Sequence, residues 1–230
     1  MTSWLFQEAA LRPKSDRQTR DPTATQKRIL AAAKHEFAKN GLGGARVDSI
    51  AARAKSNKRM LYHYFGNKED LFTRTLEDAY GAFRTAEAAL ELEKDDPVTA
   101  LRRLMSFTFN YYLANPEFIT LVNSENLHKA RHIKTSRVMD EMNRPFVARM
   151  QLLLARGVQD GVFRRDLDTV QILITVAGLG FHYLNNRHTG AFVYGRDLMS
   201  VEALKERAQF NISAILRIIC KPEILEKTGI

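Results

Sequence analysis

The sequence predicts an all-α protein. Throughout the chain, apolar residues recur three and four positions apart, which is the spacing of one buried helical face. No stretch alternates apolar and polar residues between turn signals, as a half-buried strand would. Helix-capping residues precede several of the periodic stretches, as at Asn57, Asn67, Asp96 and Ser200. We therefore expect helices alone, arranged as a small N-terminal unit followed by a larger one.

The composition indicates a single intracellular globular chain. With 230 residues and 45% hydrophobic content, it can bury a full core. The longest apolar stretch, residues 170–184, contains Gln171, Thr175 and His182 and is too short and polar to span a membrane. The single cysteine, Cys220, excludes an internal disulfide framework. We expect a cytoplasmic protein without a secretory signal or a membrane partner.

Positive charge is concentrated at the N-terminal end. Residues 1–70 hold 14 Lys and Arg against 7 Asp and Glu, a net of +7, whereas the remaining 160 residues hold 21 against 19, a net of +2 (35 − 14 and 26 − 7). Such asymmetry indicates a polyanionic partner for the N-terminal part, although a basic face that binds nothing is common when charge is the only signal.

The first 44 residues are predicted to form an arm and one helix. Residues 1–20 show no sustained period and carry four arginines and lysines, so we expect a flexible basic arm that either contacts DNA or is a simple tail. Asp21 and Pro22 suit a helix start, and Asn40-Gly41 suits its end. Residues 41–44 are then expected to be a loop.

Residues Val47 to Phe65 are predicted to form a helix-turn-helix. Val47, Ile50, Ala51 and Ala54 have the spacing of a buried face, Lys55-Ser56-Asn57 interrupts it, and Asn57 can cap a second helix. In this motif the second helix enters the major groove of DNA with its N-terminal residues leading. The cations of the second helix lie at that leading end, which favours DNA binding by a domain of residues 21–68.

A long connecting helix and a helical body are expected to follow, over residues 69–230. Asn67 can cap a helix that continues toward Leu90. Further helices are predicted from Asp96-Pro97 to Asn115, over 117–129, over 134–160, from Asp168 to Leu184, and from Ser200 to Ile219. Pro145 is expected to kink or break the fourth of these six helices.

The N-terminal pattern resembles the TetR family of bacterial transcriptional regulators over about 45 residues. The matching segments are Ile29-Leu30-Ala31-Ala32-Ala33, Phe37, Gly41, Val47-Asp48-Ser49-Ile50-Ala51, Leu61-Tyr62-His63-Tyr64-Phe65 and Lys68-Glu69-Asp70-Leu71. The resemblance implies a DNA-binding head joined to a divergent helical domain that dimerises and binds a small-molecule effector.

Two positions depart from the family pattern. Arg46 stands where the family commonly has a small hydroxyl residue, and Lys55-Ser56-Asn57 replaces a Gly-Val-Ser turn. A lysine in the left-handed conformation that the turn favours would cost about 1 kcal/mol relative to glycine. Both departures add cations near the expected DNA face.

Eight residues are predicted to contact DNA. Arg59 has the geometry for two hydrogen bonds to guanine, Lys58 suits a phosphate or a base, and Lys68 lies at a helix start where a phosphate is favoured. The complete set is Arg46, Lys55, Asn57, Lys58, Arg59, Tyr62, His63 and Lys68. Leu61, Tyr64 and Phe65 are expected to belong to the core of the head.

A small-molecule effector is expected among the helices after Asp95, with a small organic acid as a candidate class. Aromatic and apolar side chains would line the pocket and polar ones would orient the ligand, although each is individually a common core or surface residue. The predicted set is Phe107, Tyr111, Asn123, Asn126, His128, Arg131, Phe146, Met150, His182 and Tyr183, and Phe118 is a further candidate for the apolar wall.

Neither a metal nor another cofactor is predicted. His128 and His132 lie four apart with Glu125 one turn earlier, which is compatible with two metal ligands on one helical face. No cysteine and no obvious third ligand accompanies them, so a solvated or pocket-lining pair is the expectation.

A homodimer is expected through the last two long helices. They carry the small residues Ala177, Gly178 and Gly180 beside Phe181, and then the stripe Ile212, Ile215 and Ile219. These helices would form a four-helix interface with a second subunit, unless they pack only within their own domain.

The leading hypothesis is a homodimeric repressor that binds a roughly palindromic DNA operator and is released by its effector. Activation of transcription by the same DNA binding is left open beside repression. Two alternatives are a ligand-independent nucleoid or division factor of the same fold and an all-α enzyme. The enzyme is disfavoured because the sequence has no nucleophile elbow, His-Glu-x-x-His motif or glycine-rich phosphate loop.

Overall fold

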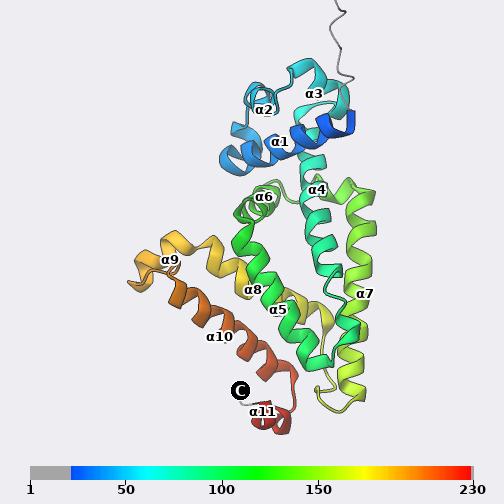
Figure 1. Cartoon of the computed structure of the whole chain (residues 1–230), viewed down its shortest axis with the longest axis vertical. Helices are drawn as coiled ribbons and strands as arrows, with labels where there is room; N and C mark the ends of the chain where they lie inside the picture. Colours follow the sequence, from blue (N-terminus) through cyan, green and yellow to red (C-terminus); the bar gives the residue numbers. More distant parts are fainter. Residues whose placement is uncertain (1–21, 229–230) are drawn as a thin grey trace, which may run out of the picture.

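The computed structural model describes residues 22–228, whose regular elements are helices with no β-strand among them (Figure 1). The predicted all-α fold is therefore confirmed. The basic arm and the capping role of Asp21 lie outside the described residues. The helices are α1 (Pro22–Gly44), α2 (Val47–Arg53), α3 (Lys58–Phe65), α4 (Lys68–Ala88), α5 (Pro97–Ala114), α6 (Pro116–Leu127), α7 (Arg137–Gln159), α8 (Thr169–Asn185), α9 (Arg187–Tyr194), α10 (Val201–Ile219) and α11 (Pro222–Thr228), with short 3-10 turns η1 (Leu92–Lys94) and η2 (Ile133–Thr135).

Helices α1–α3 form a head at one end of the molecule, and α4 leads from it into the body (Figure 1). The residues that begin these helices explain their bounds. The Asn57 side chain accepts a hydrogen bond from Met60 N at 2.9 Å, and Asn67 forms a complete capping box with Asp70 at the start of α4. The predicted caps of both helices are confirmed, as are those of Asp96 and Ser200.

The body is a bundle in which α5 lies centrally and packs against α7, α8 and α10. Its apolar core includes Leu101, Phe163, Ile215 and Ile219. Head and body also share one apolar cluster, which runs from Phe37 of α1 through Phe72 of α4 to the aromatic residues of α5 and α6. The boundary near residue 68 therefore divides the elements by position rather than by separate cores.

Several local expectations need correction. Gly41 interrupts α1 with a φ of 65°, as expected for a helix end, but residues 42–44 continue as helix and bury Leu42 instead of forming a loop. Pro145 lies inside α7, which nevertheless runs unbroken from Arg137 to Gln159. Helices α9 and α11 have no counterpart among the predicted helices. None of the helices in the described part is both long and apolar enough to cross a membrane.

Candidate nucleic-acid interface and body cavities

The exposed face of α3 carries five of the eight residues predicted to contact DNA. Leu61 and Phe65 face the core of the head, so the opposite side of this helix remains at the surface. Asn57, Lys58, Arg59, Tyr62 and His63 are all exposed there. The burial pattern thus separates the predicted core residues from the predicted contact residues, although Tyr64 is only half-buried, beside the rings of His63 and Phe65.

The charged side chains of this face differ in what they bind. Arg59 and Lys55 make no side-chain hydrogen bond or ion pair within the described residues. Lys58 lies 3.4 Å from Asp48 of α2 in an exposed ion pair, a kind of contact worth at most about 1 kcal/mol. Lys58 can therefore exchange Asp48 for another anion at little cost, and Arg59 has no side-chain contact of this kind to break.

Of two predicted phosphate contacts, the side chain of Lys68 binds within the protein, whereas Arg46 is held through its backbone alone. The Lys68 ammonium donates to the carbonyl oxygens of Gly43 at 3.3 Å and Ala45 at 3.1 Å, which ties the start of α4 to the end of α1. The backbone N–H of Arg46 donates to the buried carboxylate of Glu36 at 3.0 Å, while its side chain stays exposed. Lys68 thus has a structural role that its position at a helix start did not indicate.

The turn between α2 and α3 adopts the left-handed conformation that the family pattern implies. Lys55 has a φ of 49°, a region in which a non-glycine residue is strained by about 1 kcal/mol. The N–H groups of Lys55 and Ser56 bond back to Ala52 and Ala51, so the turn closes normally despite the substitution.

The loop between α6 and α7 connects the body to the start of α4, next to the head. The buried His132 ring nitrogen Nδ1 lies 2.6 Å from Glu125 Oε2, and Glu125 also accepts from the backbone N–H groups of His132 and Ile133. The His132 ring packs edge-on against Phe72 of α4, and Arg131 forms a 2.7 Å ion pair with Glu69. These contacts hold the body against the first turn of α4.

The two histidines considered as metal ligands instead bind other groups of the protein. His132 is bound by Glu125, and His128 Nδ1 lies 2.7 Å from the carbonyl oxygen of Ser124. Among the described residues, no cluster of three metal-ligating side chains is formed.

The structure does not bring the ten predicted effector residues into one cavity. Phe107 and Tyr111 stack around Phe83 in an aromatic cluster that joins α4 to α5. Phe118 belongs to the same cluster, 5.4 Å from the Phe83 ring centre. The polar candidates of α6 and its following loop lie at the surface or at the joint with α4, namely Asn123, Asn126, His128 and Arg131. Among the described residues, Phe146 with Met150 and His182 with Tyr183 line cavities, in two different places.

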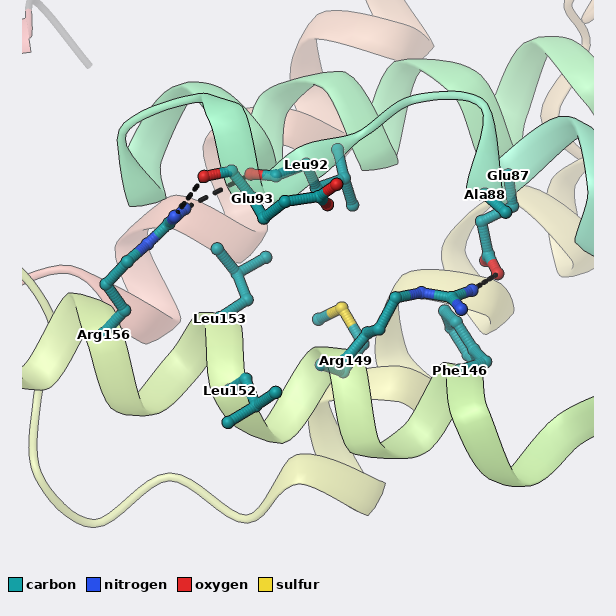
Figure 2. A pocket seen from close by; sticks show the side chains of 10 residues that line it. Glu87, Ala88, Leu92, Glu93, Phe146, Arg149, Leu152, Leu153 and Arg156 are labelled. Carbon is teal, nitrogen blue, oxygen red and sulfur yellow. Dashed lines mark hydrogen bonds and ion pairs between the residues drawn. The ribbon is translucent and has the colours of Figure 1, made fainter.

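The first cavity, of about 140 Å³, lies between the end of α4, η1 and α7 (Figure 2). Its walls are apolar and include the predicted residues Phe146 and Met150. Two arginines and two glutamates add charge. The full lining is Glu87, Ala88, Leu92, Glu93, Phe146, Arg149, Met150, Leu152, Leu153 and Arg156.

Two of the charged lining residues, Glu87 and Arg156, are held by contacts within the protein, as is Arg84 beside the cavity. Glu87 is 3% exposed and receives two hydrogen bonds of 2.9 Å from Arg84; its burial raises the carboxyl pKa, partly offset by Arg84. Arg84 in turn stacks on the Phe146 ring at 3.9 Å. Arg156 donates to the backbone carbonyls of Leu92, Glu93 and Asp95 and so fixes η1 to α7.

The second cavity, of about 380 Å³, is more open and lies between α8, α9 and α10. The other predicted pair, His182 and Tyr183, lines it together with Arg207. Tyr183 donates its hydroxyl to the carbonyl of Leu198, and the Arg207 guanidinium stacks over the Tyr183 ring at 5.1 Å. No residue of α4 reaches this cavity.

The predicted dimer stripe needs a correction. Ile215 and Ile219 are fully buried in the body's own core, and Gly180 is closed in by Phe109 and Tyr112. The exposed apolar stripes lie beside them. Val170, Ile174 and Gly178 are exposed and spaced by four on α8, and Phe210 and Ile218 are exposed on α10 with the half-buried Ala214 between them. Helices α8 and α10 pack against each other.

Sequence reasoning missed four buried carboxylates, which hold the joints of the molecule. Glu36 fixes the link into α2, Glu77 accepts from Ser136, Glu87 pairs with Arg149 of α7, and Glu125 holds the loop after α6. A glutamate within a helix is usually at the surface, so its identity alone carried no signal.

Comparisons with known proteins agree over both parts of the chain. The family described as "Bacterial regulatory proteins, tetR family" matches residues 29–75, and "Tetracyclin repressor-like, C-terminal domain" matches residues 97–215. The chain is 37% identical over 193 residues to the HTH-type transcriptional repressor NicS of Pseudomonas putida, covering 84% of this chain and 91% of that protein.

Solved structures show the same fold. A putative transcriptional regulator from Streptomyces coelicolor superposes with a TM-score of 0.64 at 25% identity, over 85% of this chain and 98% of the other. The regulator FadR of Bacillus subtilis, solved in complex with stearoyl-CoA, gives a TM-score of 0.62 at 18% identity, over 83% and 97%.

Proposed function

The chain belongs to the TetR family of bacterial regulatory proteins and is a DNA-binding transcriptional regulator; from this premise we propose a homodimeric repressor released by a small molecule. The observation that carries the proposal is the exposed leading end of α3, where Arg59 has no partner within the described residues. Repression is favoured because relatives such as NicS are named repressors.

In the proposed complex, α3 enters the major groove with Asn57, Lys58 and Arg59 leading. Arg59 reads guanine through two hydrogen bonds, and Lys58 exchanges Asp48 for a phosphate or base. Tyr62 and His63 contact the backbone farther along the helix. Arg46 and Lys55 are exposed cations beside it, and Lys68 adds positive charge at the start of α4.

Dimerisation proceeds through the exposed stripes of α8 and α10. Burying Ile174 and Phe210 against a second copy removes side chains that are 59% and 60% exposed in the single chain. One short recognition helix makes few base contacts, so two heads are required for operator specificity.

Effector release uses α4 as a lever. The body contacts this helix at both ends, through Glu69 and Phe72 near the head and through Glu87 at the far end. A helix of 21 residues is about 30 Å long. A tilt produced at the far end by a bound ligand therefore moves the head, and two moved heads no longer match successive major grooves.

In vitro selection of bound duplexes from a random pool tests the DNA-binding proposal. We expect a palindrome whose half-sites are separated by about one helical turn or a multiple of it. Enrichment of unrelated sequences, or of a single half-site, would contradict the operator model and favour a nucleoid factor that binds many sites.

Sedimentation of a charged variant tests the dimer. Ile174→Glu with Phe210→Glu is expected to yield monomers that bind a single half-site. Phe192→Glu is the matched control, because Phe192 is 89% exposed on α9, away from both stripes. A double variant that stays dimeric while the control dissociates would place the interface on α9 instead.

A thermal-shift screen of small organic acids distinguishes the proposed effector-released repressor from the ligand-independent alternative. A regulator of the proposed kind is stabilised by its effector and then loses affinity for the selected duplex. Turnover of the same compounds would instead indicate an enzyme.

A further inference from the structure

We propose that the cavity between α4 and α7 binds a single-ring monoanion, such as an aromatic carboxylate, through Arg149. This inference rests on the proposed release by a small molecule and specifies the site and the charge of that molecule. It depends on three features of the cavity: its size, its unequal charges and its contact with α4.

The volume sets the size of the ligand. A cavity of about 150 Å³ is known to accommodate a benzene ring, and this one holds about 140 Å³. Phe146, Met150 and Leu153 provide apolar walls for such a ring. A long acyl chain does not fit this space, whereas one ring with a small substituent does.

Arg149 sets the charge, because it is the one lining cation without a hydrogen bond in the described structure. The Arg156 Nη1 and Nη2 atoms donate to backbone carbonyls, its buried Nε atom has no partner among the described residues, and Glu87 is already paired with Arg84. The Arg149 Nη2 atom lies 3.6 Å from Glu87 Oε2, too far for a hydrogen bond, and its side chain is 44% exposed (Figure 2). Its planar donors match a carboxylate in two parallel hydrogen bonds.

Arg84, Arg149 and Glu87 together leave a net positive charge at one end of the cavity. Glu93 lies on the opposite wall with Leu92, and Figure 2 shows it across the cavity from Arg149. An anion is therefore attracted to the Arg149 end, while a neutral ring gains only the apolar contacts. A cation would have to approach Glu93, an exposed carboxylate whose contribution solvent screens.

Contact with α4 distinguishes this cavity from the larger one beside α9. Glu87 and Ala88 lie in the last turn of α4, and a ligand seated between Ala88 and Leu153 pushes against that turn. A ligand that draws Arg149 away from Glu87 also weakens the ion pair between these two residues, which links α7 to the end of α4. Binding here thus acts on the helix that carries the head.

Calorimetric titration with three ring compounds of similar size tests the charge. Benzoate is the anion, benzamide the neutral analogue and benzylamine the cation, each measured with the full chain at pH 7 and equal ionic strength. We expect benzoate to bind at least about tenfold more tightly than benzamide, and benzylamine more weakly still. Equal affinities for benzoate and benzamide, or no binding of benzoate at millimolar concentrations, would overturn the proposal.

Two variants test the site. Arg149→Gln should reduce benzoate affinity to that of benzamide, whereas Arg144→Gln, five residues earlier on α7 and paired with Asp140, should leave it unchanged. Ala88→Trp fills the cavity from an exposed position on α4 and should abolish binding of all three compounds. Loss of benzoate binding in Arg207→Gln but not in Arg149→Gln would assign the anion to the cavity beside α9.

A DNA-release assay separates this inference from the function on which it rests. If benzoate binds through Arg149 and lowers the affinity of the protein for the selected duplex, the anion site and its effector role are both supported. If it binds through Arg149 but leaves the DNA complex intact, the anion site stands and its effector role is wrong. Failure to select any duplex contradicts the proposed repressor, and the calorimetry still decides the anion site.

Discussion

The head and the body differ in how far apart along the chain their candidate ligand-binding residues lie. In the head, the exposed cations and polar residues around α3 come from one continuous segment, Arg46 to Lys68. In the body, Glu87 and Arg149 meet across the first cavity from α4 and α7, which are far apart in the sequence. The head can therefore be predicted from local pattern, whereas the body's cavities depend on how distant helices pack.

The comparison also separates two kinds of charged residue. Arg59 and Lys55 in the head, and Arg149 in the body, retain unused hydrogen-bond donors and are the sites where we expect ligands. Lys68, Arg84 and Arg156 instead donate to other groups of the protein, although the buried Nε of Arg156 has no partner among the described residues. The type of residue does not distinguish the two groups; their hydrogen-bond partners do.

The largest expected effect concerns the core that both regions share. Phe72 is fully buried between Phe37 of the head and His132 of the body. Phe72→Ala should lower the free energy of unfolding by about 3–5 kcal/mol, through lost burial and the cavity left behind. Urea unfolding followed by circular dichroism measures it. Phe192→Ala, at an exposed position, is the control. Two separate transitions, with only one shifted, would show that head and body are independent.

A buried phenol in the body gives the next effect. Burial raises the pKa of Tyr112 to about 12, with Tyr80 adding to the shift. Since the folded pKa is above the unfolded value of about 10, the stabilisation is complete below pH 10 and is lost as the pH rises to 12. Two pKa units correspond to about 2–3 kcal/mol.

Tyr112→Phe should remove this part of the alkaline loss of stability, as measured by urea unfolding between pH 9 and 12. Tyr194→Phe is the control because Tyr194 is 69% exposed. An unchanged pH dependence in the Tyr112 variant would mean that the phenol has the same pKa in the folded and unfolded states.

Base recognition by the head is expected to depend on Arg59. Arg59→Ala should weaken binding of the selected duplex by about 1–3 kcal/mol and relax the preference at one base pair. Fluorescence anisotropy with single-substitution duplexes measures both. Lys68→Ala should instead weaken all duplexes alike, and Arg144→Ala none of them. A loss at Arg59 that is equal for every sequence would indicate a phosphate contact.

The smallest expected effect is relief of strain in the turn. Lys55 has a φ of 49°, so Lys55→Gly should stabilise the protein by up to about 1 kcal/mol relative to Lys55→Ala. The alanine variant is matched because it removes the same charge but keeps the strain. Both should reduce DNA affinity equally if Lys55 contacts a phosphate. A glycine variant no more stable than the alanine variant would mean that the turn relaxes.

Some contacts around the candidate sites followed directly from local sequence. Asn57 and Asn67 were predicted as caps because a cap acts on backbone groups two or three residues away. Leu61 and Phe65 were predicted as core because they lie four apart on one helix. Helix α9 escaped prediction because it follows α8 directly and Asn186 at its start makes no side-chain capping hydrogen bond.

The sequence by itself determined the all-α class, the helix-turn-helix and the face of α3 that remains exposed, because these depend on spacing and capping within a few turns of helix. Only the tertiary structure decided that Ile215 and Ile219 are core while Phe210 is surface, that Lys68 binds carbonyl oxygens, and that Arg149 faces a cavity with unused donors. The physical reason is that burial and hydrogen-bond partners are set by neighbours distant in sequence, which no local pattern specifies.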